Sequence, residues 1–124
     1  MTKIDIGMKR VLVAEDNDSN WMLMTYVLKR NYEPARACNG EEAVKMALTG
    51  EYDLVIMDLK MPVMDGLEAT RQIKAALPDL PIIALTANAF DSDRQAAFTA
   101  GCDNFMSKPV SADKCLKMIA DYIG

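Results

Sequence analysis

The stretch that most constrains the fold is residues 52–66, which read YDLVIMDLKMPVMDG. It contains an unbroken apolar run from Leu54 to Met57, typical of a strand buried on both faces of a parallel sheet. The run ends at Asp58, and the proline and glycine residues that follow predict an irregular loop. Because open α/β sheets keep their ligand crevice at the carboxyl ends of the strands, Asp58 is a candidate functional residue. Taken alone, an acid at such a place is more often an ordinary turn cap.

Comparable apolar runs alternate with amphipathic segments along the chain. Parallel strands need crossover connections, which are right-handed, so this alternation predicts an α/β doubly wound five-stranded parallel sheet with helices on both faces. The expected strands are 10–14, 32–38, 54–58, 80–86 and 104–106, and the expected helices are about 19–28, 41–48, 66–77, 90–100 and 111–123. In the first helix, Asp18 or Ser19 is expected as the cap. Its expected core face consists of Leu23, Met24, Val27 and Leu28.

Length and composition indicate one globular domain. The chain has 124 residues, which are enough for a single core. We assign residues 1–8 to a flexible lead or linker remnant and residues 9–124 to the domain. No apolar run approaches the roughly 18 residues of a membrane span, and no signal peptide is recognisable, so we expect a cytoplasmic domain that does not contact a membrane. The three scattered cysteines suggest buried free thiols rather than disulfides or a zinc site.

Charge and the absence of histidine exclude several functions. A net charge of −4 argues against direct nucleic-acid binding, which needs a basic face. The chain contains no histidine, so it cannot form a Ser-His-Asp triad, a histidine-ligated metal site or a phosphohistidine of its own. Any histidine chemistry must come from another polypeptide or domain.

Five chemically active side chains follow the ends of four expected strands. They are Glu15 and Asp16 after the first strand, Asp58 after the third, Thr86 after the fourth and Lys108 after the fifth. In a parallel sheet these ends share one edge. Each residue alone has an ordinary explanation as a solvated loop, a surface lysine or a strand former. The set is far more specific, because the right residue types occur at the right end of four strands.

Three acids at one edge suggest a metal site. Carboxylates about 4 Å apart repel by roughly 1–4 kcal/mol per pair, and a divalent cation removes that cost. The all-oxygen ligand set favours Mg²⁺, with Mn²⁺ as a possible substitute. Lys108 and Thr86 are suited to contacting phosphoryl oxygens, and Asp58 can be the nucleophile. This pattern predicts phosphoryl transfer to an aspartate.

Residues 9–123 resemble the receiver domain of two-component response regulators. The resemblance rests on VLVAEDN at 11–17, VIMDLKMPVMDG at 55–66, ALTA at 84–87 and the Lys-Pro pair in FMSKPV at 105–110. It implies the flavodoxin-like strand order 2-1-3-4-5 and a cis bond between Lys108 and Pro109. It also implies that Asp58 accepts the phosphoryl group, that Thr86 and Lys108 contact it, and that Asp16, water-assisting Glu15 and the Lys60 backbone carbonyl bind Mg²⁺.

The resemblance further implies a switch and partners. Phosphorylation is expected to draw in Thr86 and let Phe105 move inward, although Phe105 is equally compatible with ordinary packing. Lys60 and Asn88 are expected to tune the lifetime of the phosphoryl group. Trp21 and Met22 are candidates for docking a histidine kinase or histidine phosphotransfer domain, with a core-edge role for Trp21 as the alternative. The output partner is not specified, and EDN-x-x-N at 15–20 looks most like receivers of hybrid histidine kinases.

The resulting hypothesis is a phosphorelay receiver that catalyses its own phosphorylation and dephosphorylation but is not an independent turnover enzyme. One alternative is a Mg²⁺-dependent aspartyl-phosphate phosphatase, which the lone acid after the third strand disfavours. A second is a flavin-binding electron carrier, disfavoured by the acidic loop at 15–18, where a phosphate-binding loop is needed. A third is an interaction module that does not depend on phosphorylation.

Overall fold

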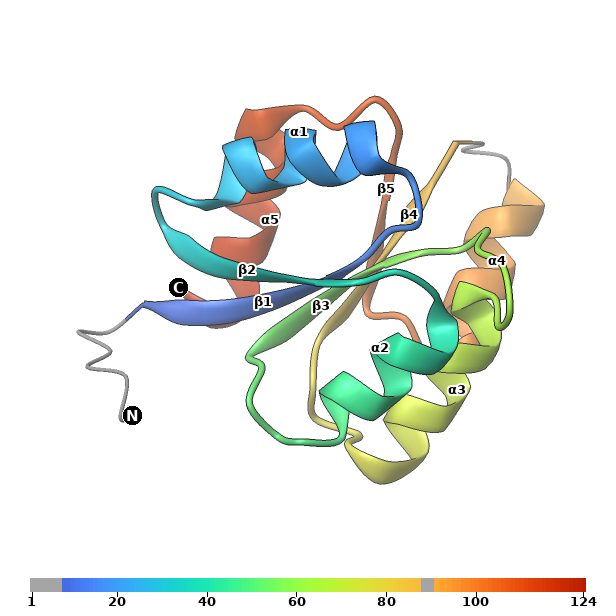
Figure 1. Ribbon diagram of the computed structural model, residues 1–124. Helices are drawn as coiled ribbons and strands as arrows, with labels where there is room; N and C mark the ends of the chain where they lie inside the picture. Colours follow the sequence, from blue (N-terminus) through green and yellow to red (C-terminus); the bar gives the residue numbers. More distant parts are fainter. Residues whose placement is uncertain (1–7, 88–90) are drawn as a thin grey trace.

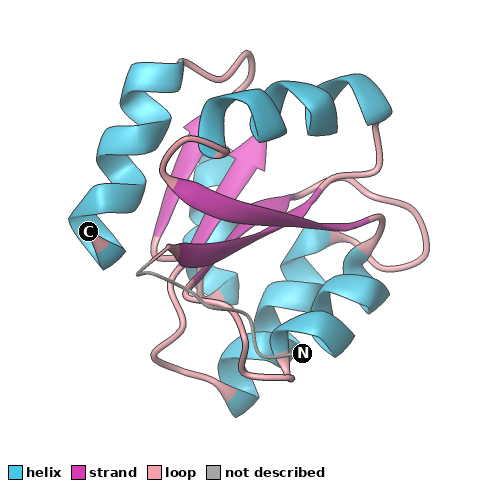
Figure 2. Cartoon of the chain, turned by 60° about the vertical axis from the view of Figure 1, so that its left-hand side comes forward, coloured by secondary structure: helices cyan, strands magenta, loops and turns pink. Residues whose placement is uncertain are grey.

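The computed structural model describes residues 8–87 and 91–124 and confirms the doubly wound α/β sheet. Five parallel strands lie in the order β2-β1-β3-β4-β5 (Figure 1), and helices lie on both sides of the sheet (Figure 2). The strands are β1 (Lys9–Ala14), β2 (Tyr32–Ala37), β3 (Leu54–Asp58), β4 (Ile82–Thr86) and β5 (Asn104–Ser107). The helices are α1 (Asp18–Leu28), α2 (Gly40–Ala47), α3 (Gly66–Ala76), α4 (Asp91–Ala100) and α5 (Ala112–Ile123). The lead expected at 1–8 lies outside the described residues except for Met8.

Two apolar clusters cover the two faces of the sheet. α1 and α5 lie on one face, and α2, α3 and α4 lie on the other (Figure 1). Along β3, Leu54 and Ile56 face the first layer, whereas Val55 and Met57 face the second. All five residues of β3 are buried, because side chains of a central parallel strand alternate between two covered faces. The unbroken apolar run in the sequence therefore reflects burial on both sides.

The strand register places the polar strand ends at one level. Ala14 of β1 pairs in register with Met57 of β3. Glu15, the residue after Ala14, therefore lies at the level of Asp58, the residue after Met57, and Asp16 comes next in the chain. Asp58 pairs in register with Leu85, one residue before Thr86. Thr86 in turn lies beside Ser107, one residue before Lys108. The parallel topology thus gathers residues that are far apart in the chain.

The first helix differs from the prediction in two respects. Asn17 caps α1, because its side chain accepts a hydrogen bond from the Asn20 amide, so the expected caps Asp18 and Ser19 are wrong. Leu23, expected in the core, is 43% exposed. The apolar residues of α1 are spread around much of the helix, so spacing alone did not identify the buried side. Met24, Val27 and Leu28 are buried as expected.

The cysteines are free thiols, but only two are buried. Cys38 is exposed at the end of β2, which corrects the expectation that all three are buried, whereas Cys102 and Cys115 lie in the core. Burial raises the pKa of both core thiols, that of Cys115 to about 11.

Alkylation should separate these thiols. Iodoacetamide at about pH 8 should modify Cys38 alone in the folded protein, because only an exposed thiolate reacts readily. Intact mass should show one adduct under native conditions and three after unfolding in urea. Rapid native modification of Cys115 would contradict its burial.

Candidate functional site

The predicted site residues lie together at the carboxyl edge of the sheet. Glu15 and Asp16 follow β1, Asp58 ends β3, Thr86 ends β4 and Lys108 follows β5. One oxygen from each of Glu15, Asp16 and Asp58 lies within 4.8 Å of the other two. Glu15, Asp58 and Thr86 are buried, whereas Asp16 is exposed.

Among the described residues, Lys108 is the cation that contacts this acidic cluster. Its Nζ donates to Asp58 Oδ2 at 3.1 Å and lies 3.3 Å from Glu15 Oε1. The Lys108 amide also donates to the Thr86 carbonyl at 2.8 Å, which holds the loop after β5 against the end of β4. Burial by itself lowers the pKa of Lys108, but the hydrogen bond and charge of Asp58, together with Glu15, raise it overall. Lys108 therefore stays charged.

Glu15 is a fully buried carboxylate whose Oε1 is compensated only by the ion pair with Lys108 at 3.3 Å among the described residues. Its Oε2 accepts the Asn17 amide at 3.1 Å, but within the described part of the chain Oε1 accepts no well-aligned hydrogen bond. Burial raises the pKa of Glu15, and the nearby charge of Asp58 raises it further. A cation would satisfy this oxygen and offset the repulsion. The three hard oxygen donors fit Mg²⁺ or Mn²⁺ better than a thiol-seeking metal.

The loop after β3 holds Asp58 in place. The Lys60 amide donates to Asp58 Oδ1 at 3.1 Å, and the Gly66 amide donates to the Leu59 carbonyl at 3.0 Å. A Cβ on Gly66 would collide with the Asp58 carbonyl, so only glycine permits this approach. At the loop crest, Val63 has φ +69° and is 76% exposed.

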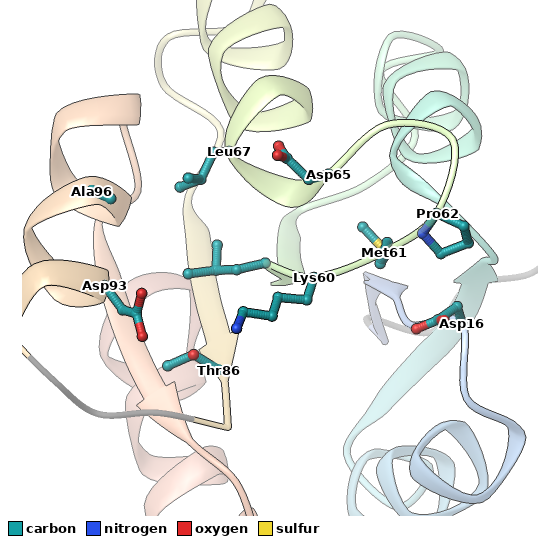
Figure 3. Close-up of a pocket in the computed structure, with 10 residues that line it drawn as sticks. Asp16, Lys60, Met61, Pro62, Asp65, Leu67, Thr86, Asp93 and Ala96 are labelled. Atoms are coloured by element: carbon teal, nitrogen blue, oxygen red, sulfur yellow. The ribbon is translucent and has the colours of Figure 1, made fainter.

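An open cleft of about 510 Å³ adjoins the acids (Figure 3). Asp16 and Pro62 lie on one side of it, and Thr86 and Asp93 lie on the other. The Lys60 side chain extends across the cleft toward Thr86 in Figure 3. The cleft is bounded by Asp16, by Thr86 and by Leu59 and Lys60, the two residues that directly follow Asp58.

The candidate switch and docking residues have defined surroundings. The half-buried Phe105 ring packs edge-on to Phe98 at 6.3 Å, with the Arg94 guanidinium 5.0 Å from its centroid. Met22 is 69% exposed, whereas Trp21 is half-buried against the core beneath Arg36. Asn88 lies outside the described residues.

Sequence reasoning missed several residues around the site. Asn17 binds Glu15, Gly66 allows the loop to pass Asp58, Asp93 lines the cleft and Arg36 binds the Glu15 carbonyl. The Asp-Gly pair at 65–66 was a usable signal for the close approach. Arg36 had no such signal, because it lies in a strand far from the acids in sequence.

A doubly wound parallel sheet with three acids, a threonine and a lysine at its carboxyl edge is characteristic of flavodoxin-like, CheY-like domains. The family model described as response regulator receiver domain matches residues 11–120, and the chain belongs to that family. It is thus a receiver domain of two-component signalling. The Lys108-Pro109 bond is cis, as the resemblance implied.

Particular relatives refine this assignment. The chain is 43% identical over 119 residues, 91% of its length, to hybrid signal transduction histidine kinase G of Dictyostelium discoideum, but spans only 4% of that protein. The receiver of sensor histidine kinase PA1611 from Pseudomonas aeruginosa, with magnesium coordinated in its active-site cleft, is 34% identical at TM-score 0.89, covering 95% of this chain and 99% of that one. A receiver of Saccharomyces cerevisiae Ssk1, crystallised with the histidine phosphotransfer protein Ypd1, is 30% identical at TM-score 0.87, covering 93% and 88%.

Among the described residues, no helix is both long and apolar enough to cross a membrane.

Proposed function

We propose that this receiver accepts a phosphoryl group from a phosphohistidine onto Asp58 in a reaction that requires Mg²⁺. The observation that carries the proposal is the joint position of Asp58: its carboxylate lies in a cluster of three acids and accepts hydrogen bonds from Lys108 and the Lys60 amide. An attacking oxygen, a fixed cation and an acidic metal site are the parts that phosphoryl transfer needs.

The chain supplies the nucleophile and most of the positioning. An Asp58 oxygen attacks phosphorus, the bond from phosphorus to the donor imidazole nitrogen breaks, and the imidazole keeps the electron pair and takes up a proton. The half-buried Lys108 ammonium remains close to the phosphoryl oxygens and stabilises their charge. Thr86, which follows the register partner of Asp58 at the end of the neighbouring strand, contacts the same group in this proposal. Water can later hydrolyse the acyl phosphate through the open cleft.

Glu15, Asp16, Asp58 and the Lys60 backbone carbonyl would hold the metal. Bound Mg²⁺ supplies charge neutralisation between the carboxylates and the incoming phosphoryl oxygens. The burial of Glu15 supports this assignment, because the single Lys108 ammonium faces both Glu15 and Asp58 and Glu15 Oε1 accepts no aligned hydrogen bond among the described residues.

The exposed side of α1 suits a helical donor. Met22, Leu23 and Tyr26 are 69%, 43% and 72% exposed, and together they form an apolar strip beside the site. A histidine kinase or histidine phosphotransfer domain would dock there and bring its phosphohistidine to the cleft, in the cytoplasm. Trp21 supports this strip from beneath, since it packs on the core cluster of α1 and α5.

Phosphorylation is read out at Phe105. Movement of Thr86 toward the new phosphoryl group would leave space beside β5, and Phe105 would exchange its contacts with Arg94 and Phe98 for that space. The output surface then includes α4 and β5. Lys60, whose side chain crosses the cleft, and Asn88 tune hydrolysis.

Metal dependence tests the proposal. Incubation with acetyl phosphate and Mg²⁺ should add one phosphoryl group, seen by intact mass, and chelation with EDTA should reduce the initial rate at least about 100-fold, because the clustered carboxylates would otherwise repel the donor. Mn²⁺ should restore activity. Equal rates with and without EDTA would refute the metal-dependent mechanism, and no modification in any condition would leave the interaction module as the better function.

A further inference from the structure

Arg36 lies beside the acidic cluster although it comes from a different strand. It is on β2, in register with Val13 of β1, and its side chain is only 20% exposed. Its guanidinium reaches over the end of β1, where the acid pair begins. This position ties the edge strand to the loop that carries Glu15 and Asp16.

Three contacts fix the Arg36 side chain. Its Nε donates to the Glu15 main-chain carbonyl at 3.0 Å, and a terminal nitrogen pairs with Asp18 Oδ1 at 2.9 Å. Its central carbon lies 5.9 Å from the centroid of the Trp21 ring. Because Asp18 is 87% exposed, that ion pair alone contributes little to stability. The contacts of Arg36 instead restrict the geometry of the loop, since one planar guanidinium binds the loop at two points.

The loop between those two points carries Asp16. The Glu15 amide donates to the Ala37 carbonyl at 2.9 Å, so with Arg36 both main-chain polar groups of Glu15 are bonded to β2. Arg36 also contacts Asp18, so residues 16 and 17 lie between its two points of contact on the loop. Within the described chain, the Asp16 side chain makes no hydrogen bond or ion pair. The position of the Asp16 Cα is thus constrained by a backbone segment that Arg36 contacts on both sides.

We propose that Arg36 is a positioning residue for the metal site: it clamps the main chain of the acid pair so that Glu15 and Asp16 present their oxygens together. The inference rests on the proposed use of the acidic cluster for Mg²⁺. Two effects of Arg36 on metal affinity oppose each other. Its positive charge repels a cation, whereas its fork organises the ligands, and the clamp is the larger effect.

Replacing the fork while keeping the charge separates these effects. Arg36→Lys retains a cation but cannot bond both acceptors in the same plane, and Arg36→Met removes charge and fork together. Both variants should bind Mg²⁺ about tenfold more weakly in calorimetric titration, the low end for a residue that supports metal ligands. Unchanged affinity in Arg36→Lys with tighter binding in Arg36→Met would show a purely electrostatic role and overturn the proposal.

Arg10→Lys is the matched control. Arg10 lies near the opposite end of β1 and has a comparable network, with Nε 2.9 Å from Glu33 and a terminal nitrogen 2.7 Å from Glu51. Its replacement should affect thermal stability but leave Mg²⁺ affinity within twofold. An equal loss of affinity in Arg10→Lys would attribute the effect to general loosening and overturn the positioning role.

The proposed contact of Arg36 can also be tested in the wild-type protein, without any variant. In proton–nitrogen NMR spectra, the Arg36 Nε–H should exchange slowly with solvent and shift on Mg²⁺ titration. Rapid exchange would overturn the clamp. If wild-type protein binds no Mg²⁺, both this inference and the metal-dependent function fail. If it binds Mg²⁺ but Arg36→Lys binds equally well, only the role of Arg36 fails.

Discussion

The Asp58→Asn variant should remain folded and take up no phosphoryl group from acetyl phosphate in the presence of Mg²⁺. An amide oxygen is not a competent nucleophile toward phosphorus, so the loss should reach the detection limit of intact mass spectrometry, at least about 1,000-fold in rate. Asparagine can still accept the Lys60 amide, which now donates to Asp58 Oδ1. The repulsion between Asp58 and Glu15 disappears, while Lys108 loses its hydrogen bond at 3.1 Å. These changes oppose each other, so the free energy of unfolding should shift by no more than about 1 kcal/mol.

Asp93→Asn is the matched control for this loss. Asp93 is half-buried and lines the same cleft, but it is not one of the three clustered acids. This variant should be phosphorylated at close to the wild-type rate. Modification of Asp58→Asn at the wild-type level would show that another carboxylate, such as Asp16, is the acceptor.

The Lys108→Met variant should lose both stability and reactivity. Removing the ammonium leaves Glu15, which is fully buried, and Asp58, which is 4% exposed, without their cation. Breaking a buried pair from one side costs about 3 kcal/mol, and urea unfolding without metal should show a loss of that order. The phosphorylation rate should fall about 100- to 1,000-fold, because a fixed donor to the phosphoryl oxygens is missing.

Metal and pH should rescue only the stability of Lys108→Met. Saturating Mg²⁺ should stabilise the folded state by binding the proposed acidic site, but it should not replace the donor toward phosphorus. Burial raises the pKa of Glu15 above its unfolded value, and losing Lys108 raises it further. A raised carboxyl pKa means that the folded state binds the proton more tightly, so the variant should regain stability as pH falls through that pKa.

Lys117→Met controls for the change in net charge. Lys117 is exposed on α5 and forms no ion pair among the described residues. Its replacement should change the free energy of unfolding by less than about 0.5 kcal/mol and leave the phosphorylation rate unchanged. A phosphorylation rate near wild type in Lys108→Met would contradict the assigned role of Lys108.

Much of the site could be predicted because it consists of strand ends. A buried parallel strand is recognisable as a short apolar run, and the residue that follows it lies at the carboxyl edge whatever the exact packing. Asp58, Thr86 and Lys108 were therefore identified from three separate runs, and the structure places them at one edge of the sheet. Their chemical roles stay predictions until the variants are measured.

Helix faces were less predictable. Leu23 and Met24 are adjacent in the sequence and both apolar, yet Leu23 is 43% exposed and Met24 only 1%. An apolar stripe broad enough to cover most of a helix does not specify which part meets the sheet. The angle at which α1 packs against β1 and α5 decides this, and that angle depends on contacts with residues distant in the chain.

The sequence by itself determined the alternation of strands and helices, and with it the edge where the acids, the hydroxyl and the amine meet, because burial on two faces leaves a local apolar signature. Only the tertiary structure decided which side chains support that edge. Arg36 reaches the Glu15 carbonyl across the β1–β2 pairing, and Gly66 passes beside the Asp58 carbonyl. Such contacts join segments that the chain separates, and they depend on distances and directions that the order of residues does not contain.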